Sequence, residues 1–207
     1  LEAATTDLAR APKAIIAPHA GYVYSGPVAG SAYAQLAGRA SEIKRVLLLG
    51  PSHRVPFSGL AYSCAESFLT PLGAVAADPS VFEAVRDLPQ IRPYEAPFEG
   101  EHCLEVQLPF LQVVLEDFCI LPILVGDADA KEVAQVIARL WGGEETLIVI
   151  SSDLSHYLDY DTAKAIDSDT SLAIEALSPE AIGHNQACGR NPVNGLLREA
   201  KRRGLRA

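Results

Sequence analysis

The stretch Thr146-Leu-Ile-Val-Ile-Ser-Ser-Asp-Leu-Ser-His156 joins five mostly apolar residues to a polar turn that carries an aspartate and a histidine. A short run of branched apolar residues followed by turn residues is typical of a strand that is buried on both faces of a sheet. The segments Ala14-Ile-Ile-Ala-Pro-His19 and Arg45-Val-Leu-Leu-Leu-Gly-Pro-Ser-His53 repeat this design. Because ligands bind outside the carboxyl ends of strands in open α/β sheets, the three histidines predict a site at one sheet edge.

Helical patterns alternate with these strands along the chain. Leucines at 104, 108, 111 and 115 have the spacing of an amphipathic helix, and Pro109 between them predicts a kink. We expect helices at 27–38, 79–88, 103–116, 129–140, 160–177 and 193–203, strands at 13–17, 45–49, 120–125 and 146–150, and short, partly antiparallel strands within 57–76. The alternation predicts one α/β domain over residues 1–207, with a mostly parallel or mixed central sheet covered by helices on both faces.

Composition narrows the choice of partners. The 207 residues carry a net charge of −9 and no internal run of lysine or arginine, which argues against nucleic acid or a membrane as the partner. The basic residues of 198–206 end a predicted helix, where positive charge suits the helix dipole, so we interpret them as a solvated helix end. No stretch could span a bilayer, the N-terminus lacks a signal-peptide pattern, and the four cysteines lack the spacing of a disulfide framework. We therefore expect a cytoplasmic protein.

The sequence contains no methionine, not even an initiator. We therefore expect that it is not a complete translation product and that segments are missing at its termini. We also expect that internal methionines have been left out, so that some spacings are too short.

His19 and His53 are the first candidate metal ligands. Each follows a strand end and a proline-containing turn, which restricts where its imidazole can point. Two pre-oriented imidazoles at neighbouring strand ends suit a divalent metal ion. The alternative interpretation is that both are turn histidines whose hydrogen bonds go to the backbone.

Asp153 and His156 form a second candidate pair. If the turn after the strand begins a helix, their three-residue spacing puts them on one face. The carboxylate could then fix the tautomer of the imidazole, or His156 could transfer protons. The alternative role for Asp153 is to cap the following helix, and the two roles are compatible.

Cys188 lies beside Arg190 and just before a helix that Pro192 could start. A thiol in that setting has a lowered pKa, which makes it a nucleophile or a soft metal ligand. We expect the other three cysteines to be small core residues: Cys64, Cys103 and Cys119.

Two further histidines carry weaker signals. His102 follows Glu101 at the start of a predicted helix, where it either supports the site from outside the ligand set or packs at the helix start. His184 has no strand before it and is expected in a surface loop.

Five motifs occur together and in order along the chain. They are Pro18-His-Ala-Gly-Tyr22, Gly50-Pro-Ser-His53, Glu101-His-Cys-Leu-Glu-Val-Gln-Leu-Pro-Phe110, Ser151-Ser-Asp-Leu-Ser-His156 and Cys188-Gly-Arg. The ordered set resembles the signatures of the Memo family and covers nearly the whole sequence.

The resemblance implies a fold similar to that of class III extradiol dioxygenases, whose non-haem iron opens catechol rings. It also implies that His19, His53 and Cys188 are metal ligands, and that Asp153 and His156 line the pocket, with His156 in the place of the acid–base histidine. Those dioxygenases bind Fe(II) through two histidines and a carboxylate, whereas a cysteine stands here. A thiolate favours copper(I), zinc or iron in a different redox range, and it can itself be oxidised.

Three functions stay open at this point. The first is an Fe(II)-dependent oxidoreductase that acts on dioxygen and a small catecholic or related aromatic substrate, with copper or zinc as alternative metals. The second is a metal-binding or redox module without turnover, or a scaffold for a protein partner. The third is a metal-free hydrolase with Cys188 as nucleophile, His156 as base and Asp153 as orienting group, which leaves the two strand-end histidines without a role. We expect no nucleotide cofactor, because no phosphate-binding glycine loop is present.

Overall fold

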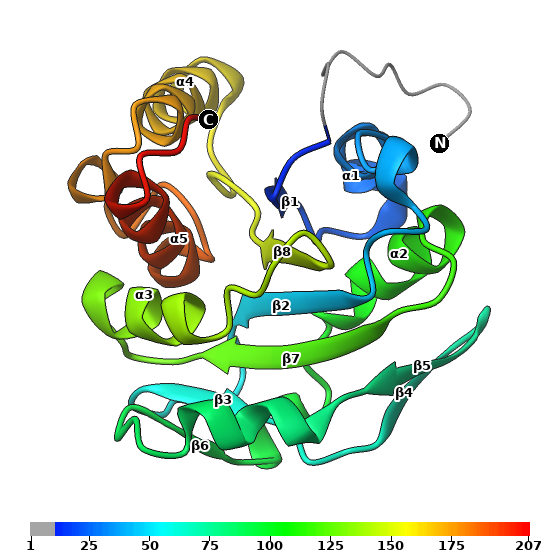
Figure 1. The fold of residues 1–207 in the computed structure, drawn as a ribbon. Helices are drawn as coiled ribbons and strands as arrows, with labels where there is room; N and C mark the ends of the chain where they lie inside the picture. The colour runs from blue at the N-terminus through cyan, green and yellow to red at the C-terminus, as the bar shows by residue number, and fades with distance from the viewer. Residues whose placement is uncertain (1–10) are drawn as a thin grey trace.

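An eight-stranded mixed sheet forms the centre of the protein in a computed structural model that describes residues 11–207 (Figure 1). The strands pair in the order β1-β8-β2-β7-β3-β6, while β5 pairs with both β4 and β7. Their bounds are β1 Ala14–Ala17, β2 Arg45–Pro51, β3 Leu60–Tyr62, β4 Ser67–Thr70, β5 Gly73–Ala77, β6 Ile91–Pro93, β7 Cys119–Val125 and β8 Thr146–Ser151. The expected α/β class with a mixed central sheet is confirmed.

The middle of the sheet is parallel, and its margin combines parallel and antiparallel pairs. Strands β1, β8, β2 and β7 run parallel, whereas β3 is antiparallel to β7 and β4 is antiparallel to β5. The antiparallel strands expected within 57–76 are therefore present. In the register, Ala17 lies opposite Ser151 and Leu49 lies opposite Ile150, so β1, β8 and β2 end at nearly the same level.

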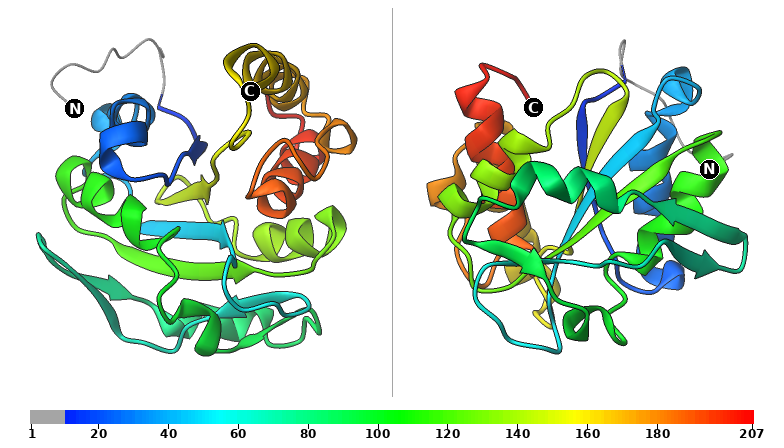
Figure 2. Two further views of the ribbon diagram at one scale, coloured as in Figure 1. Left: turned by 180° about the vertical axis from the view of Figure 1, so that it is seen from behind. Right: turned by 60° about the horizontal axis from the view of Figure 1, so that its bottom comes forward.

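Helices cover both faces of the sheet (Figures 1 and 2). Helices α3, α4 and α5 lie on one face, and α1 and α2 lie on the other. Their bounds are α1 Tyr22–Ala34, α2 Leu108–Val114, α3 Ala130–Arg139, α4 Tyr160–Glu175 and α5 Arg190–Arg202. Short 3-10 helices span Ala37–Arg39, Pro79–Val85, Ala96–Phe98, Glu105–Gln107 and Pro179–Ala181.

The strand side chains divide into two cores because successive residues point to opposite faces. Leu47 and Leu49 of β2 join the core under α3 and α5, while Val46 and Leu48 join the core under α1 and α2. All four leucine and valine side chains are fully buried. A strand that is buried on both faces explains why the sequence shows a continuous apolar run rather than an alternating one.

Three helices differ from the expected ones at their starts. Helix α1 begins at Tyr22 rather than at Pro27, and Pro27 lies inside it. The proline is tolerated because the helix is open to water beside Val23, which is 89% exposed, so solvent can satisfy the carbonyl that Pro27 cannot bond. Helix α5 also begins early, at Arg190. Helix α2 begins at Leu108 rather than at residue 103, so Pro109 lies in its first turn, where proline is tolerated.

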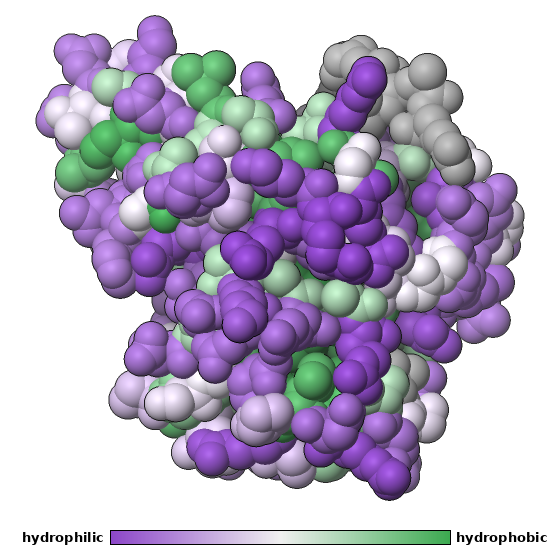
Figure 3. Space-filling model, turned by 60° about the vertical axis from the view of Figure 1, so that its left-hand side comes forward, coloured by the Kyte–Doolittle hydropathy of each residue, from purple (hydrophilic) through white to green (hydrophobic). Residues whose placement is uncertain are grey.

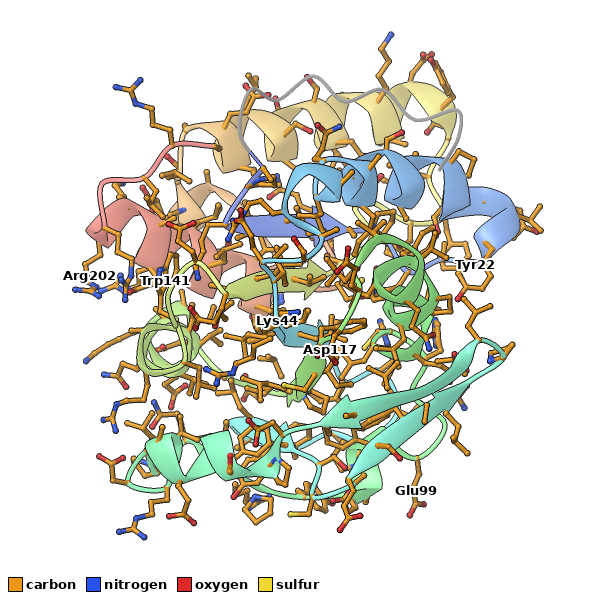
Figure 4. All side chains as sticks on the ribbon, turned by 45° about the vertical axis from the view of Figure 1, so that its right-hand side comes forward. Tyr22, Lys44, Glu99, Asp117, Trp141 and Arg202 are labelled. Carbon is orange, nitrogen blue, oxygen red and sulfur yellow. The ribbon has the colours of Figure 1, made fainter. Side chains whose placement is uncertain are left out.

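On the face shown in Figure 3, hydrophilic side chains predominate, and smaller apolar areas lie between them. No helix of the described residues is long and apolar enough to cross a membrane. The prediction about a signal peptide concerns residues 1–10, which lie outside the described part. At the end of α5, Arg202 and Arg203 bond Glu199, and Arg203 also stacks on Trp141, so this basic cluster is partly a structural contact (Figure 4).

The packing of α5 on α3 depends on Gly195. A Cβ at this position would lie 2.3 Å from Cγ1 of Val133. We predict that Gly195→Ala lowers the free energy of unfolding by about 1–2 kcal/mol, because a contact this short puts overpacking near the upper end of about 1–3 kcal/mol and the gain in helix propensity is at most about 1 kcal/mol. Urea unfolding measures this change. Gly38→Ala is the matched control, since its Cβ would meet no atom within 4 Å, and a Gly195→Ala protein as stable as its parent would contradict the argument.

Candidate metal centre

The level ends of three adjacent parallel strands bring the predicted side chains together. His19 lies two residues beyond β1, Asp153 lies two residues beyond β8, and His53 lies two residues beyond β2. The imidazole rings of His19 and His53 are 5.2 Å apart, centre to centre, and the angle between their planes is 75°. His19 is buried, whereas the His53 side chain is 35% exposed.

Cys188 reaches the same point from the loop before α5. The backbone N–H of Cys188 donates to the carbonyl of Asp153, and the N–H of Gly189 donates to Ser152 Oγ. A Cβ at Gly189 would lie 2.6 Å from that of Ser152, so the loop can approach the end of β8 only with glycine there. As a result, Cys188 Sγ lies 3.3 Å from His19 Nε2. Ligand atoms of His19, His53 and Cys188 all lie within 4.8 Å of one another.

The tautomer of His19 follows from the hydrogen bonds of Ser151. Ser151 Oγ donates its hydrogen to the carbonyl of Cys103 and accepts from Gln107 Nε2. Its contact with His19 Nδ1, at 2.8 Å, therefore has the imidazole as donor. We assign a proton of His19 to Nδ1 on this basis, so Nε2 is the nitrogen that faces Cys188 and that a hydrogen-bonded proton or a metal ion can occupy.

Glu101 orients His53 in a similar way. Its carboxylate accepts hydrogen bonds from both the backbone N–H and Nδ1 of His53, at 2.7 and 3.0 Å. It also accepts from the backbone N–H groups of His102 and Cys103. Burial opposes ionisation of this carboxyl, but the hydrogen bonds from His53 and the backbone lower its pKa to about 2. A fixed carboxylate behind an imidazole is the usual support of a metal-binding histidine.

The sulfur of Cys188 is a thiolate at neutral pH. Burial alone would raise its pKa, but hydrogen bonds with His19 and His53 outweigh burial and lower the pKa to about 6. The same bond to Cys188, followed by the bond to Glu101, raises the pKa of His53 to about 10. In protein without metal, the hydrogen bond between Cys188 and His53 therefore favours a thiolate and a protonated ring, and a metal ion bound to both would replace that proton.

These residues fit a metal ion. The lone pair of His19 Nε2 and the charge of Cys188 face each other at 3.3 Å, so a proton or another cation must lie between them. Bond lengths of about 2.0–2.3 Å in tetrahedral geometry place two ligand atoms about 3.3–3.8 Å apart. Two imidazole nitrogens and one thiolate are sufficient for an open three-ligand centre.

Asp153 and His156 lie beside this centre. Asp153 Oδ1 accepts from the backbone N–H groups of His19 and Ala20, so the carboxylate holds the turn after β1. Asp153 Oδ2 is 3.7 Å from His19 Nε2 and 3.9 Å from His156 Nε2. Asp153 does not cap α4, because the N-cap of α4 is Asp159. The two side chains approach each other although residues 152–159 form no helix.

A model of the family described as Memo-like protein matches residues 2–206. The chain belongs to the Memo family. It is 38% identical over 176 residues to a MEMO1 family protein of Aquifex aeolicus, covering 83% of this chain and 64% of that protein. It is 36% identical over 207 residues to a MEMO1 family protein of Archaeoglobus fulgidus, covering 94% of this chain and 76% of that protein. The chain thus spans less than two thirds of the Aquifex aeolicus relative.

A human relative and one solved structure are also similar to this chain. The Memo chain is 32% identical over 216 residues to human Protein MEMO1, covering 91% of this chain and 72% of the human protein. A crystal structure of an uncharacterized protein from Escherichia coli K12 is 13% identical, covers 82% of this chain and 80% of its own, and superposes with a TM-score of 0.49. The likeness to the dioxygenase fold stays a prediction.

A pocket of about 540 Å³ opens beside Cys188 in the Memo chain. Its walls combine apolar and polar groups, among them Val55, Phe57, Pro192, Ser52, Asp127 and Asn191. The volume of this pocket lies in the range of small-molecule sites.

The remaining candidates divide between the centre and the surface. His102 lies near the centre, with ring centres 5.7 and 5.8 Å from those of His19 and His53, and its side chain is half exposed. His184 is exposed, as expected. Cys103 is buried and Cys119 is partly buried, but the prediction that Cys64 is a core residue is wrong, because it lies exposed after β3 and its backbone bonds Glu95.

Sequence reasoning missed the residues that orient the two imidazoles. Ser151 and Glu101 both belong to the five sequence motifs, but the sequence indicates no contact of either residue with an imidazole. An acidic residue followed directly by histidine at a helix start is a weak signal of such a role. No sequence signal connects Gln107, which bonds Ser151 and the carbonyl of Pro18, to the centre.

The lowered pKa predicts a reactive cysteine in chelator-treated protein. The fraction of thiolate rises as pH rises through the pKa, so iodoacetamide should label Cys188 with a half-maximal rate near pH 6. The variants His19→Ala and His53→Ala should each move this midpoint upward. The measurement uses a Cys64→Ser background and mass spectrometry to identify the labelled residue. A midpoint near the ordinary thiol value of about 8.5 would contradict the assignment.

Proposed function

We propose that this Memo-family chain is a metal-dependent oxidoreductase that holds one Fe(II) ion with His19, His53 and Cys188 and acts on dioxygen and a small aromatic substrate. One observation supports this proposal most strongly. Three separate segments bring the ligand atoms of His19, His53 and Cys188 within 4.8 Å of one another, and both imidazoles are fixed from behind by Ser151 and Glu101. A bound Fe(II) would let electrons pass from the catechol, which is oxidised, to dioxygen, which is reduced.

Residues beside the centre have distinct tasks in this proposal. Asp153 keeps the turn of His19 in position through two backbone hydrogen bonds and presents its second oxygen to His156. His156 has a 40% exposed side chain and accepts or donates the proton of a substrate hydroxyl. The pocket beside Cys188 binds the ring, with Phe57 and Pro192 as apolar walls.

The donor set also supports a second candidate function, a metal-binding or redox module without turnover. The observation in its favour is the sulfur itself, because Cys188 brings a thiolate to the two histidines, whereas the dioxygenases that the sequence resembles bind iron through a carboxylate. Thiolate with imidazole suits copper(I) and zinc as well as iron. A cysteine at the centre can also be oxidised when oxygen is activated beside it.

One experiment separates the two functions. Protein purified without added metal is first analysed for its elements and then loaded anaerobically with one equivalent of Fe(II). Oxygen uptake is measured with a panel of catechols. We predict that His53→Ala and Cys188→Ser lose the iron, whereas His156→Ala keeps it and loses turnover by about 10²–10⁴-fold.

The outcomes of this experiment lead to different conclusions. Iron binding that depends on His53 and Cys188, without oxygen uptake on any catechol, supports the module without turnover. Iron binding that is unchanged in both variants sinks the proposed centre. The exposed histidine variant His184→Ala is the control, and it should behave as the parent does.

The role of Glu101 gives a separate prediction for metal affinity. Glu101→Gln removes the carboxylate that accepts from His53 Nδ1, which makes the imidazole a weaker ligand. Loss of such a supporting group costs about 10–100-fold in metal affinity. Competition with a chelator measures the change, circular dichroism tests the fold, and Glu105→Gln, an exposed residue nearby, is the control. An affinity that stays within about twofold of the parent would remove Glu101 from this role.

A further inference from the structure

We propose that Asp153, His156 and Cys188 form a second metal site beside the first, with the sulfur of Cys188 shared between two ions. The proposal rests on the metal centre proposed above and adds a second ion to it. Ligand atoms of the three residues all lie within 4.8 Å of one another, as do those of His19, His53 and Cys188. Cys188 is the residue that the two groups have in common.

The carboxylate of Asp153 is divided between two tasks. Its Oδ1 is fixed by the backbone N–H groups of His19 and Ala20, at 2.8 and 3.2 Å. Its Oδ2 accepts no hydrogen bond from a described backbone group and lies 3.9 Å from His156 Nε2. That separation is close to the spacing of two ligand atoms on one tetrahedral ion. The hydrogen bonds to Oδ1 therefore orient the carboxylate of Asp153 so that Oδ2 faces the second site.

His156 is free to act as a ligand. Within residues 11–207 its imidazole makes no hydrogen bond, and its polar neighbour is Asp153. Its side chain is 40% exposed and that of Asp153 is 18% exposed, so a hydrated ion can enter from solvent. His19 and His53, by contrast, are already fixed through Nδ1. The second site is thus the more open and the weaker of the two.

The charges around the shared sulfur favour a second cation. Cys188, Asp153 and Glu101 supply three negative charges when ionised, and one divalent ion neutralises two of them. Over residues 11–207, neither Asp153 nor Glu101 forms an ion pair with lysine or arginine; their partners are histidines. One nitrogen, one carboxylate oxygen and one sulfur suit a borderline divalent ion such as Zn(II).

A second ion would change the role of His156. As a ligand, the imidazole can no longer carry a proton to or from a substrate. Protein with one ion would therefore retain the proton-transfer group, and protein with two ions would not. The second site would act as a brake on turnover when the metal is abundant.

Zinc stoichiometry tests the proposal without any measurement of activity. Metal-free protein is dialysed against excess Zn(II), and the bound zinc is determined by elemental analysis. We expect two ions per chain for the parent and for His184→Ala, one for His156→Ala, and one for His53→Ala. Cys188→Ser should lose both sites. Co(II) in place of Zn(II) gives a second readout, because thiolate-to-cobalt absorption should rise with both equivalents in the parent and stop after one in His156→Ala.

The zinc stoichiometries distinguish a failure of this proposal from a failure of the first metal centre. A parent that binds one zinc ion, kept in His156→Ala and lost in His53→Ala, overturns the second site and leaves the first. Two ions in His156→Ala also overturn it. A single ion that His156→Ala loses and His53→Ala keeps would instead overturn the first centre. Circular dichroism of each variant confirms that loss of zinc is not loss of fold.

Discussion

The parallel register of β1, β8 and β2 is the constraint on which the site depends. Because Ala17 lies opposite Ser151 and the end of β2 lies at the same level, each strand delivers its polar turn to one edge. Backbone hydrogen bonding fixes that register, and a slip by one residue would turn every buried side chain of a strand to the other face. The positions of His19 and His53 therefore follow from the same apolar packing that stabilises the sheet.

Burial of polar groups under this edge requires that each has a partner. Ser151 is fully buried and makes three hydrogen bonds, to His19, Gln107 and the carbonyl of Cys103. Tyr33, also fully buried, donates to Gln107. An unsatisfied group here would cost about 1–3 kcal/mol, so each member restricts the geometry of the next. Residues of α1, of the 3-10 helix Glu105–Gln107 and of β8 thus restrict the orientation of the His19 imidazole.

Much of this arrangement was predictable from sequence. The rest could not be predicted, and in each case a physical reason explains why. Continuous apolar runs predicted the buried strands, and a strand end followed by histidine predicted the edge. The predicted start of α1 at Pro27 is wrong, because Pro27 is tolerated inside this helix, where an exposed turn lets water satisfy the free carbonyl. The support of His53 by Glu101 joins residues 48 positions apart, and no local pattern encodes such a pair.

The sulfur of Cys188 connects the two proposals through charge. With a carboxylate as third ligand, the negative charge would be spread over two oxygens and a second ion would find fewer soft donors. A thiolate concentrates charge on one polarisable atom, which can bind two ions at once. Asp153 and His156 lie on the open side of that atom, so the groups that could move a proton are also the groups that could hold a second ion. Metal supply would then decide between the two states, because one pair of side chains cannot serve both.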